Sequence, residues 1–107
     1  MQIIAFGDSY SDDGVKLKLS TKAVAAGIPG AVVMADPKLY FDGRYSNGRV
    51  AIEDLARSLN IKLIDYAVGG AMSGDQNYES WMDDYTATGI QAQIASFKET
   101  RTKRGLN

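Results

Sequence analysis

Two apolar runs along the chain predict two strands that each end at glycine. Residues 2–6 (QIIAF) stop at Gly7, and residues 61–68 (IKLIDYAV) stop at Gly69 and Gly70. A short apolar run bounded by turn-forming residues is typical of a buried strand. We therefore expect a buried first strand and a second strand, and the carboxyl ends of both carry glycine.

A helical pattern lies between these strands. Residues 49–59 (RVAIEDLARSL) have apolar positions at spacings of three and four, which predicts an amphipathic helix. Ser46 or Asn47 is expected to cap its start, and Asn60 suits its end.

Weaker patterns predict further helices over residues 16–26 and 90–104. Residues 31–34 fit either a short strand or buried chain without regular structure. Residues 74–89 are expected to form a polar loop. The order of strand, helix and strand favours a parallel sheet with helical crossovers, since parallel strands need such connections.

Composition narrows the class of protein. The chain has 107 residues, 45% of them apolar, and 12 basic residues against 13 acidic ones. This indicates a single small domain, with no nucleic acid or anionic membrane as its main partner. The absence of cysteine excludes disulfides and thiolate sites, and the absence of histidine removes the commonest general base and zinc ligand.

The sequence gives little on location. No apolar run approaches about 18 residues, so no transmembrane segment is expected. No basic and then apolar leader precedes Gln2, so no signal peptide is visible. As written, the chain fits the cytoplasm, while a secreted parent protein stays open.

Ser9 is the main candidate for chemistry, because it follows the first strand directly after Gly7 and Asp8. Ligands of open parallel sheets bind beyond the carboxyl ends of the strands. A serine there can attack a carbonyl, and glycine lets a backbone N–H approach the developing oxyanion. From the residues alone, a turn after the strand is the favoured interpretation of Ser9. A strand-ending turn is the alternative for Gly69 and Gly70, and it is compatible with an oxyanion role.

Three ordered stretches carry a family resemblance. Residues 6–14 (FGDSYSDDG) look like the opening block of the GDSL esterase/lipase family, within the SGNH hydrolases. Residues 43–49 (GRYSNGR) resemble the family's Gly-Arg-Phe-Ser-Asn-Gly-Arg stretch. Residues 65–71 (DYAVGGA) are similar to its second block, usually Asn-Phe/Tyr-Ala-x-Gly-Gly-Ala. The resemblance covers nearly the whole chain.

The resemblance implies an α/β fold with a flavodoxin-like parallel sheet and flanking helices. Members run well past the length of this chain, so we expect residues 1–107 to be a single partial domain, the N-terminal part of an SGNH hydrolase. The implied activity is hydrolysis of a small-molecule or lipid ester through a serine acyl-enzyme, with no cofactor and no metal.

The resemblance also assigns roles to residues. Ser9 would be the nucleophile and would donate its own N–H to the oxyanion. Gly70, rather than Gly69, would be the next donor of the oxyanion hole. Asp8 and Asp12 would shape and hydrogen-bond the nucleophile loop.

Departures from the family pattern limit what the isolated chain can do. Residues 74–77 (GDQN) have the letters of the Gly-x-Asn-Asp block in the wrong order, so Asn77 is not assigned to the oxyanion hole. The Asp-x-x-His block is absent, and Asp65 stands where asparagine is usual. We expect little or no turnover from this chain alone, because a serine without its base is a poor nucleophile. The alternative is a non-catalytic α/β remnant that binds a ligand or partner through the same crevice.

Other polar residues are assigned to structure. Asp8, Asp12 and Asp13 lack the glycine spacing of an EF-hand loop, so no metal site is expected. Arg44 and Arg49 are expected to pair with loop carboxylates such as Asp42 or Asp12.

Three aromatic side chains have two interpretations, as the lining of an acyl pocket or as packing over the sheet edge: Tyr78, Trp81 and Tyr85. A partial sheet leaves an apolar edge uncovered, so we expect self-association or marginal folding.

Overall fold

The computed structural model describes residues 1–103. Along these residues the elements are β1 (Gln2–Ala5), α1 (Val15–Ala25), α2 (Ala51–Ser58), β2 (Lys62–Asp65), α3 (Ser80–Tyr85) and α4 (Ile90–Lys103).

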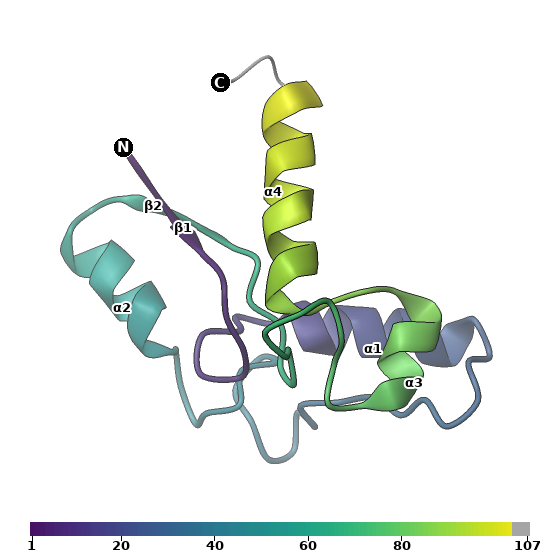
Figure 1. Ribbon diagram of the computed structural model, residues 1–107. Coiled ribbons are helices and arrows are strands. Elements are labelled where there is room, and N and C mark those ends of the chain that lie inside the picture. Colours follow the sequence, from purple (N-terminus) through teal and green to yellow (C-terminus); the bar gives the residue numbers. More distant parts are fainter. Residues whose placement is uncertain (104–107) are drawn as a thin grey trace.

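The two strands form a parallel pair. Gln2 lies opposite Lys62, and Ala5 lies opposite Asp65. Helices α2 and α4 stand on opposite sides of this pair, and α1 and α3 lie together beyond its carboxyl end (Figure 1). The expected α/β class is therefore confirmed, and the arrangement is that of a partial flavodoxin-like fold.

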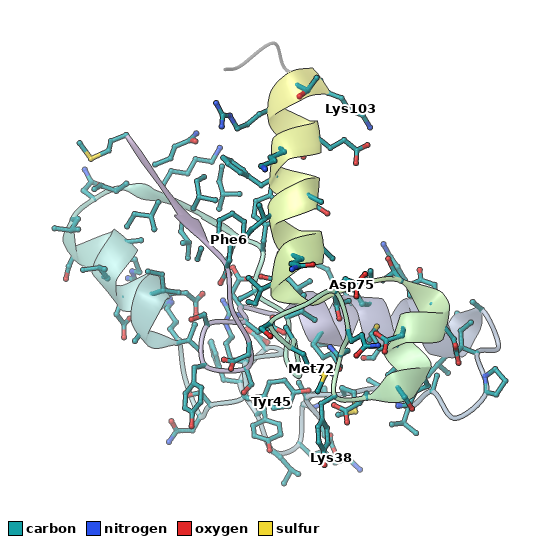
Figure 2. All side chains as sticks on the ribbon, in the orientation of Figure 1. Phe6, Lys38, Tyr45, Met72, Asp75 and Lys103 are labelled. Atoms are coloured by element: carbon teal, nitrogen blue, oxygen red, sulfur yellow. The ribbon has the colours of Figure 1, made fainter. Side chains whose placement is uncertain are left out.

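Aromatic residues join α4 to the sheet. The ring of Phe6, just after β1, lies 5.8 Å from that of Tyr66 and 5.8 Å from that of Phe97 on α4. Phe6 projects between the strands and α4 (Figure 2). The contact with Tyr66 is stacked and that with Phe97 is edge-to-face, and both kinds add to the free energy gained from apolar burial.

Helix α2 confirms the prediction from its apolar stripe, but its predicted start cap is wrong. Neither Ser46 nor Asn47 caps it; the N-cap residue is Val50, whose N–H donates to Glu53 Oε2 over 2.9 Å. Asn60 ends the helix as expected, with a φ of 55° and its N–H on the carbonyl of Arg57. A residue in this left-handed conformation satisfies a free carbonyl at the helix end.

The other two predicted helices occur with small shifts of boundary, and the structure has one helix that was not predicted. Residues 16–26 and 90–104 correspond to α1 and α4, with Arg104 outside the described residues. The expected polar loop over residues 74–89 contains α3, which buries Met82. Residues 31–34 form neither strand nor helix.

The prediction that the first strand is buried is wrong. Every residue of β1 and β2 is at least partly exposed, because the sheet has two strands and each keeps an open edge. The fully buried side chains lie elsewhere, and the largest of them are Lys16, Met82, Asp12 and Ser20. Within residues 1–103, no helix has the length and apolarity needed to span a bilayer.

Candidate active site

The carboxyl ends of β1 and β2 lie side by side. Beyond the strands the pairing continues, since the N–H of Tyr66 donates to the carbonyl of Ala5 (2.9 Å) and that of Val68 to Gly7 (3.1 Å). The loop of residues 8–14, called the first loop, and that of residues 67–71, called the second loop, therefore start at the same edge of the sheet. This is the edge where open parallel sheets bind ligands.

The first loop is a tight turn whose hydrogen bonds do not involve the hydroxyl or the N–H of Ser9. The carbonyl of Asp8 accepts the N–H groups of Ser11 (3.1 Å) and Asp12 (3.0 Å), and its carboxylate accepts that of Tyr10 (3.1 Å). Ser9 is half-buried, and within residues 1–103 neither its hydroxyl nor its N–H has a hydrogen-bond partner. Both groups are thus available to a ligand.

Asp12 ties the two loops together. Its fully buried carboxylate accepts N–H groups from Gly14 (2.8 Å) and Val15 (2.7 Å) through Oδ1, and from Lys16 (3.0 Å) and Gly69 (2.7 Å) through Oδ2. Three of these donors open α1, where a negative charge is favoured by the helix dipole. The fourth, at Gly69, lies in the second loop, so one carboxylate sets the distance between the loops.

Some backbone N–H groups of the second loop have a hydrogen-bond acceptor and one does not. The N–H of Gly69 is bound by Asp12, and that of Ala71 donates to the carbonyl of Val68 over 3.0 Å. The N–H of Gly70 has no acceptor in the part of the chain that the structure describes. Of the two glycines predicted as oxyanion donors, only Gly70 therefore has an uncommitted amide.

Close packing explains why both positions are glycine. At Gly70, which has a φ of 81°, a Cβ would lie 2.5 Å from Asn77 Oδ1 and 3.1 Å from Lys16 Nζ. A Cβ at Gly69 would lie 2.5 Å from the ring of Tyr45. Burial raises the pKa of the Tyr45 hydroxyl to about 12, with the charges of Asp12 and others adding to the effect, so this ring is a neutral cover over the loop.

A buried polar floor lies under the second loop. Lys16 Nζ donates to the Gly69 carbonyl (2.7 Å), Asn77 Oδ1 (3.2 Å) and Glu79 Oε1 (3.1 Å). Asn77 Nδ2 donates to the same carbonyl (3.0 Å) and to Thr88 Oγ1 (2.9 Å). Because the amide of Asn77 is fully used inside the protein, it has no N–H left for a ligand.

Gln93 of α4 clamps the residue that precedes the first loop. The N–H of Gly7 donates to Gln93 Oε1, and Gln93 Nε2 donates back to the Gly7 carbonyl, both over 2.9 Å. Nε2 also donates to the carbonyl of Thr88, and Gln93 is 4% exposed. Lys16 and Gln93 had no role in the sequence analysis, because a lone Lys or Gln in a helical pattern carries no sequence signal.

Asp65 stands where the family usually has asparagine, and burial disfavours the ionised form of its carboxyl group. Its Oδ1 accepts the N–H of Ala67 over 2.9 Å, whereas the buried Oδ2 has no hydrogen-bond partner within residues 1–103. Burial raises the pKa of Asp65 to about 7, the Ala67 bond opposes this, and the charges of Asp13, Asp12 and Glu53 add to it. A substantial fraction of Asp65 is therefore protonated at neutral pH.

Arg44 is structural, as expected, but its partners differ from those expected. Its guanidinium pairs with the carboxylate of Glu53, with Nε 3.1 Å from Oε2, and it donates to the backbone carbonyl of Asp42 over 2.9 Å. Burial would raise the pKa of Glu53, but hydrogen bonds from Arg44 and Val50 lower it below its usual range. This pair fixes residues 42–50, which lie beside the second loop.

The aromatic candidates are separated. Tyr78 is 78% exposed, whereas Trp81 and Tyr85 lie half-buried on α3, with Trp81 against Gly30. Among residues 1–103, no group of three acidic, histidine or cysteine side chains is arranged to hold a metal ion.

Known proteins with similar sequences indicate a family relationship. No family model matches the chain. It is 31% identical over 96 residues to the thermolabile hemolysin of Vibrio parahaemolyticus, and 29% and 30% identical over 119 and 122 residues to two GDSL esterase/lipases of Arabidopsis thaliana. Each match covers at least 90% of this chain.

The chain is a relative of the GDSL esterase/lipases. It spans 30% of the length of each plant GDSL esterase/lipase and 19% of the hemolysin. The resemblance seen in the three sequence blocks is thereby confirmed.

Proposed function

We propose that this chain carries the nucleophile and oxyanion side of a GDSL-type ester hydrolase. The observation that carries the proposal is the free N–H of Gly70 in a loop whose neighbouring amides are bound, beside a loop in which Ser9 also keeps a free hydroxyl and N–H. Two unpaired backbone donors next to an unpaired hydroxyl are what acyl transfer needs.

The proposed reaction is acyl transfer to Ser9, followed by hydrolysis. Ser9 Oγ attacks the ester carbonyl carbon, and the N–H groups of Ser9 and Gly70 stabilise the oxyanion. The ester C–O bond then breaks, the alcohol leaves with the proton of Oγ, and water releases the acid from Ser9. The substrate class is a small-molecule or lipid ester, as the family relationship supports.

A base must take the proton from Ser9, and the sequence has no histidine. Removing the histidine of a triad costs on the order of 10⁶-fold in kcat in subtilisin. The chain alone should therefore turn over little or no ester, and a fluorophosphonate probe should leave Ser9 unlabelled. Labelling of Ser9 without any added base would contradict this part of the proposal.

Imidazole can supply the missing base and so test the nucleophile. The chain is incubated with p-nitrophenyl acetate, with and without imidazole, and acetylation is followed by mass spectrometry with peptide mapping. Imidazole should accelerate acetylation at Ser9. Ser9→Ala should abolish this acetylation, whereas Ser11→Ala, two residues along the same loop, should retain it. Equal acetylation of the Ser9→Ala variant would refute the assignment.

The absence of histidine also favours a second candidate, a non-catalytic module that binds a ligand through the same crevice. The two candidates differ in the imidazole experiment. A binding module predicts no acetylation of Ser9 at any imidazole concentration.

A further inference from the structure

The peptide group that joins Gly69 to Gly70 is bound at one end and free at the other. Its carbonyl oxygen accepts from Lys16 Nζ (2.7 Å) and from Asn77 Nδ2 (3.0 Å). Its N–H, which belongs to Gly70, has no acceptor within residues 1–103. The orientation of this one peptide group therefore depends on two buried side chains.

Because the peptide group is planar, holding the Gly69 carbonyl also fixes the direction of the Gly70 N–H. The described chain contains no cis peptide bond, so the C=O and the N–H of this planar group point to opposite sides. Holding the carbonyl of Gly69 toward Lys16 therefore aims the N–H of Gly70 away from the polar floor.

Burying the ammonium group of Lys16 under the second loop costs free energy, so its presence there needs an explanation. Lys16 is fully buried, and removing an ammonium group from water is unfavourable unless its donors are paired. Its three N–H donors meet three acceptors, on Gly69, Asn77 and Glu79. The shortest of the three contacts is the one to the Gly69 carbonyl.

A charged donor on a carbonyl also changes the other end of the peptide. In an interior of low dielectric, a hydrogen bond polarises the group that accepts it, and linked hydrogen bonds strengthen one another. A cation on the Gly69 carbonyl oxygen draws electron density from the peptide nitrogen. The N–H of Gly70 becomes a stronger donor as a result.

We propose that Lys16 is a positioning residue that orients and polarises the Gly69–Gly70 peptide, so that the Gly70 N–H is presented to the oxyanion. The oxyanion role rests on the proposed function, but the effect of Lys16 on the peptide does not. A purely structural Lys16 would pair with Glu79 to hold α1 near α3, and it would leave the Gly70 amide unchanged.

NMR of the labelled chain separates these roles. In Lys16→Met, the carbonyl carbon of Gly69 and the amide of Gly70 should shift far more than the amide of Gly7. Lys18→Met, which removes an exposed lysine of the same helix, should leave all three unchanged. Lys16→Arg, which keeps a cationic donor, should restore part of the shift.

A second variant keeps the proposal testable if Lys16→Met does not fold. Glu79→Gln removes the carboxylate that shares the Lys16 charge, so more of that charge acts on the Gly69 carbonyl. The Gly70 amide proton should then move downfield, opposite to its movement in Lys16→Met. An unmoved Gly70 amide in a folded variant of either kind would overturn the proposal.

The imidazole reaction distinguishes failure of the proposal from failure of the function. Lys16→Met should slow imidazole-dependent acetylation of Ser9 by about tenfold, less than the 10²–10³-fold loss typical when a whole oxyanion donor is removed. The dependence of the rate on imidazole concentration should stay the same. Absence of Ser9 acetylation in every variant would count against the proposed function, whereas the Gly70 shifts would still decide the role of Lys16.

Discussion

The loops at the carboxyl end of the sheet and the sheet itself are built differently. The loop network, which consists of Asp12, Lys16, Asn77, Thr88 and Gln93, contains five residues that are at most 4% exposed. No residue of β1 or β2 is buried to that degree. The candidate site is thus more enclosed than the sheet, and this enclosed network is polar.

This difference indicates what holds the site together. Buried polar groups stabilise a structure only when their donors and acceptors are paired, and the hydrogen bonds of the network meet this condition. A two-stranded sheet is marginal on its own, because each strand leaves one edge unpaired. The loops should therefore tolerate the loss of a polar partner less well than the sheet tolerates the loss of an apolar one.

The largest expected effect compares these two regions directly. Asp12→Ala leaves four N–H groups without an acceptor, two buried and two part-buried. It should cost more than about 3 kcal/mol of unfolding free energy, at about 1–3 kcal/mol for each buried group. Phe97→Ala removes a half-buried ring from the sheet side and should cost about 1.5 kcal/mol.

Urea denaturation measures both variants, with Asp8→Ala as the control. Asp8 makes one exposed hydrogen bond, to Tyr10, and its removal should cost about 0.5 kcal/mol. A larger loss for Phe97→Ala than for Asp12→Ala would reverse the comparison.

The next effect concerns the open edge of β1. Ala5 and Gly7 accept from Tyr66 and Val68, which continue β2. Since successive residues of a strand direct their backbone groups to alternate sides, Gln2 and Ile4 of β1 direct their N–H groups to the other side. Gln2→Pro removes one of these outward donors at the first residue of the strand, where proline is tolerated. We expect the chain to self-associate, and this variant to weaken the association by about tenfold, the effect of one net hydrogen bond.

Sedimentation equilibrium over a range of concentrations tests this expectation. Leu59→Lys is the matched control, because it removes an exposed leucine at the end of α2 and no backbone donor of β1. A monomer at all concentrations, or equal weakening by both variants, would exclude pairing through the edge.

The smallest expected effect is the pH dependence due to Asp65. Its pKa is about 7 in the folded chain and near 3.8 when unfolded, so the folded state binds more protons between these values. The contribution of Asp65 to stability is therefore full below about pH 4 and is lost as the pH rises through 7.

Asp65→Asn removes this dependence. At pH 8 the variant should be more stable than the unchanged chain by about 1 kcal/mol, because it removes a charge that burial disfavours and that is partly exposed. Urea denaturation at pH 5 and pH 8 measures the difference between the two chains. A variant whose stability falls with pH as steeply as that of the unchanged chain would assign the slope to other groups, such as Asp13.

The sequence predicted the elements that depend on local patterns. The stripe over residues 49–59 and the two glycine-bounded runs correspond to α2, β1 and β2. The parallel order follows from them, because a helix between two strands returns the chain to the same end. That residues 1–107 make up one partial domain remains a prediction.

Features that depend on distant contacts were not predictable from those patterns. Helix α3 has six residues, of which only Met82 is buried, so its apolar pattern is too short to see. Gln93 acts on Gly7 across 86 positions of sequence, and Lys16 acts on Gly69 across 53. Burial of the first strand was wrongly expected, because an apolar run gives the preference of its residues and not the presence of neighbours that cover them.

The most direct test of this account is the hydrogen-exchange rate of four backbone amides in the unchanged chain, measured by NMR. The amides of Gly7 and Gly69 should exchange slowly, because side chains accept their protons. Those of Ser9 and Gly70 should exchange fast, because they are left free for a ligand. Protection of Gly70 as strong as that of Gly69 would contradict the central claim that the second loop offers a free donor beside Ser9.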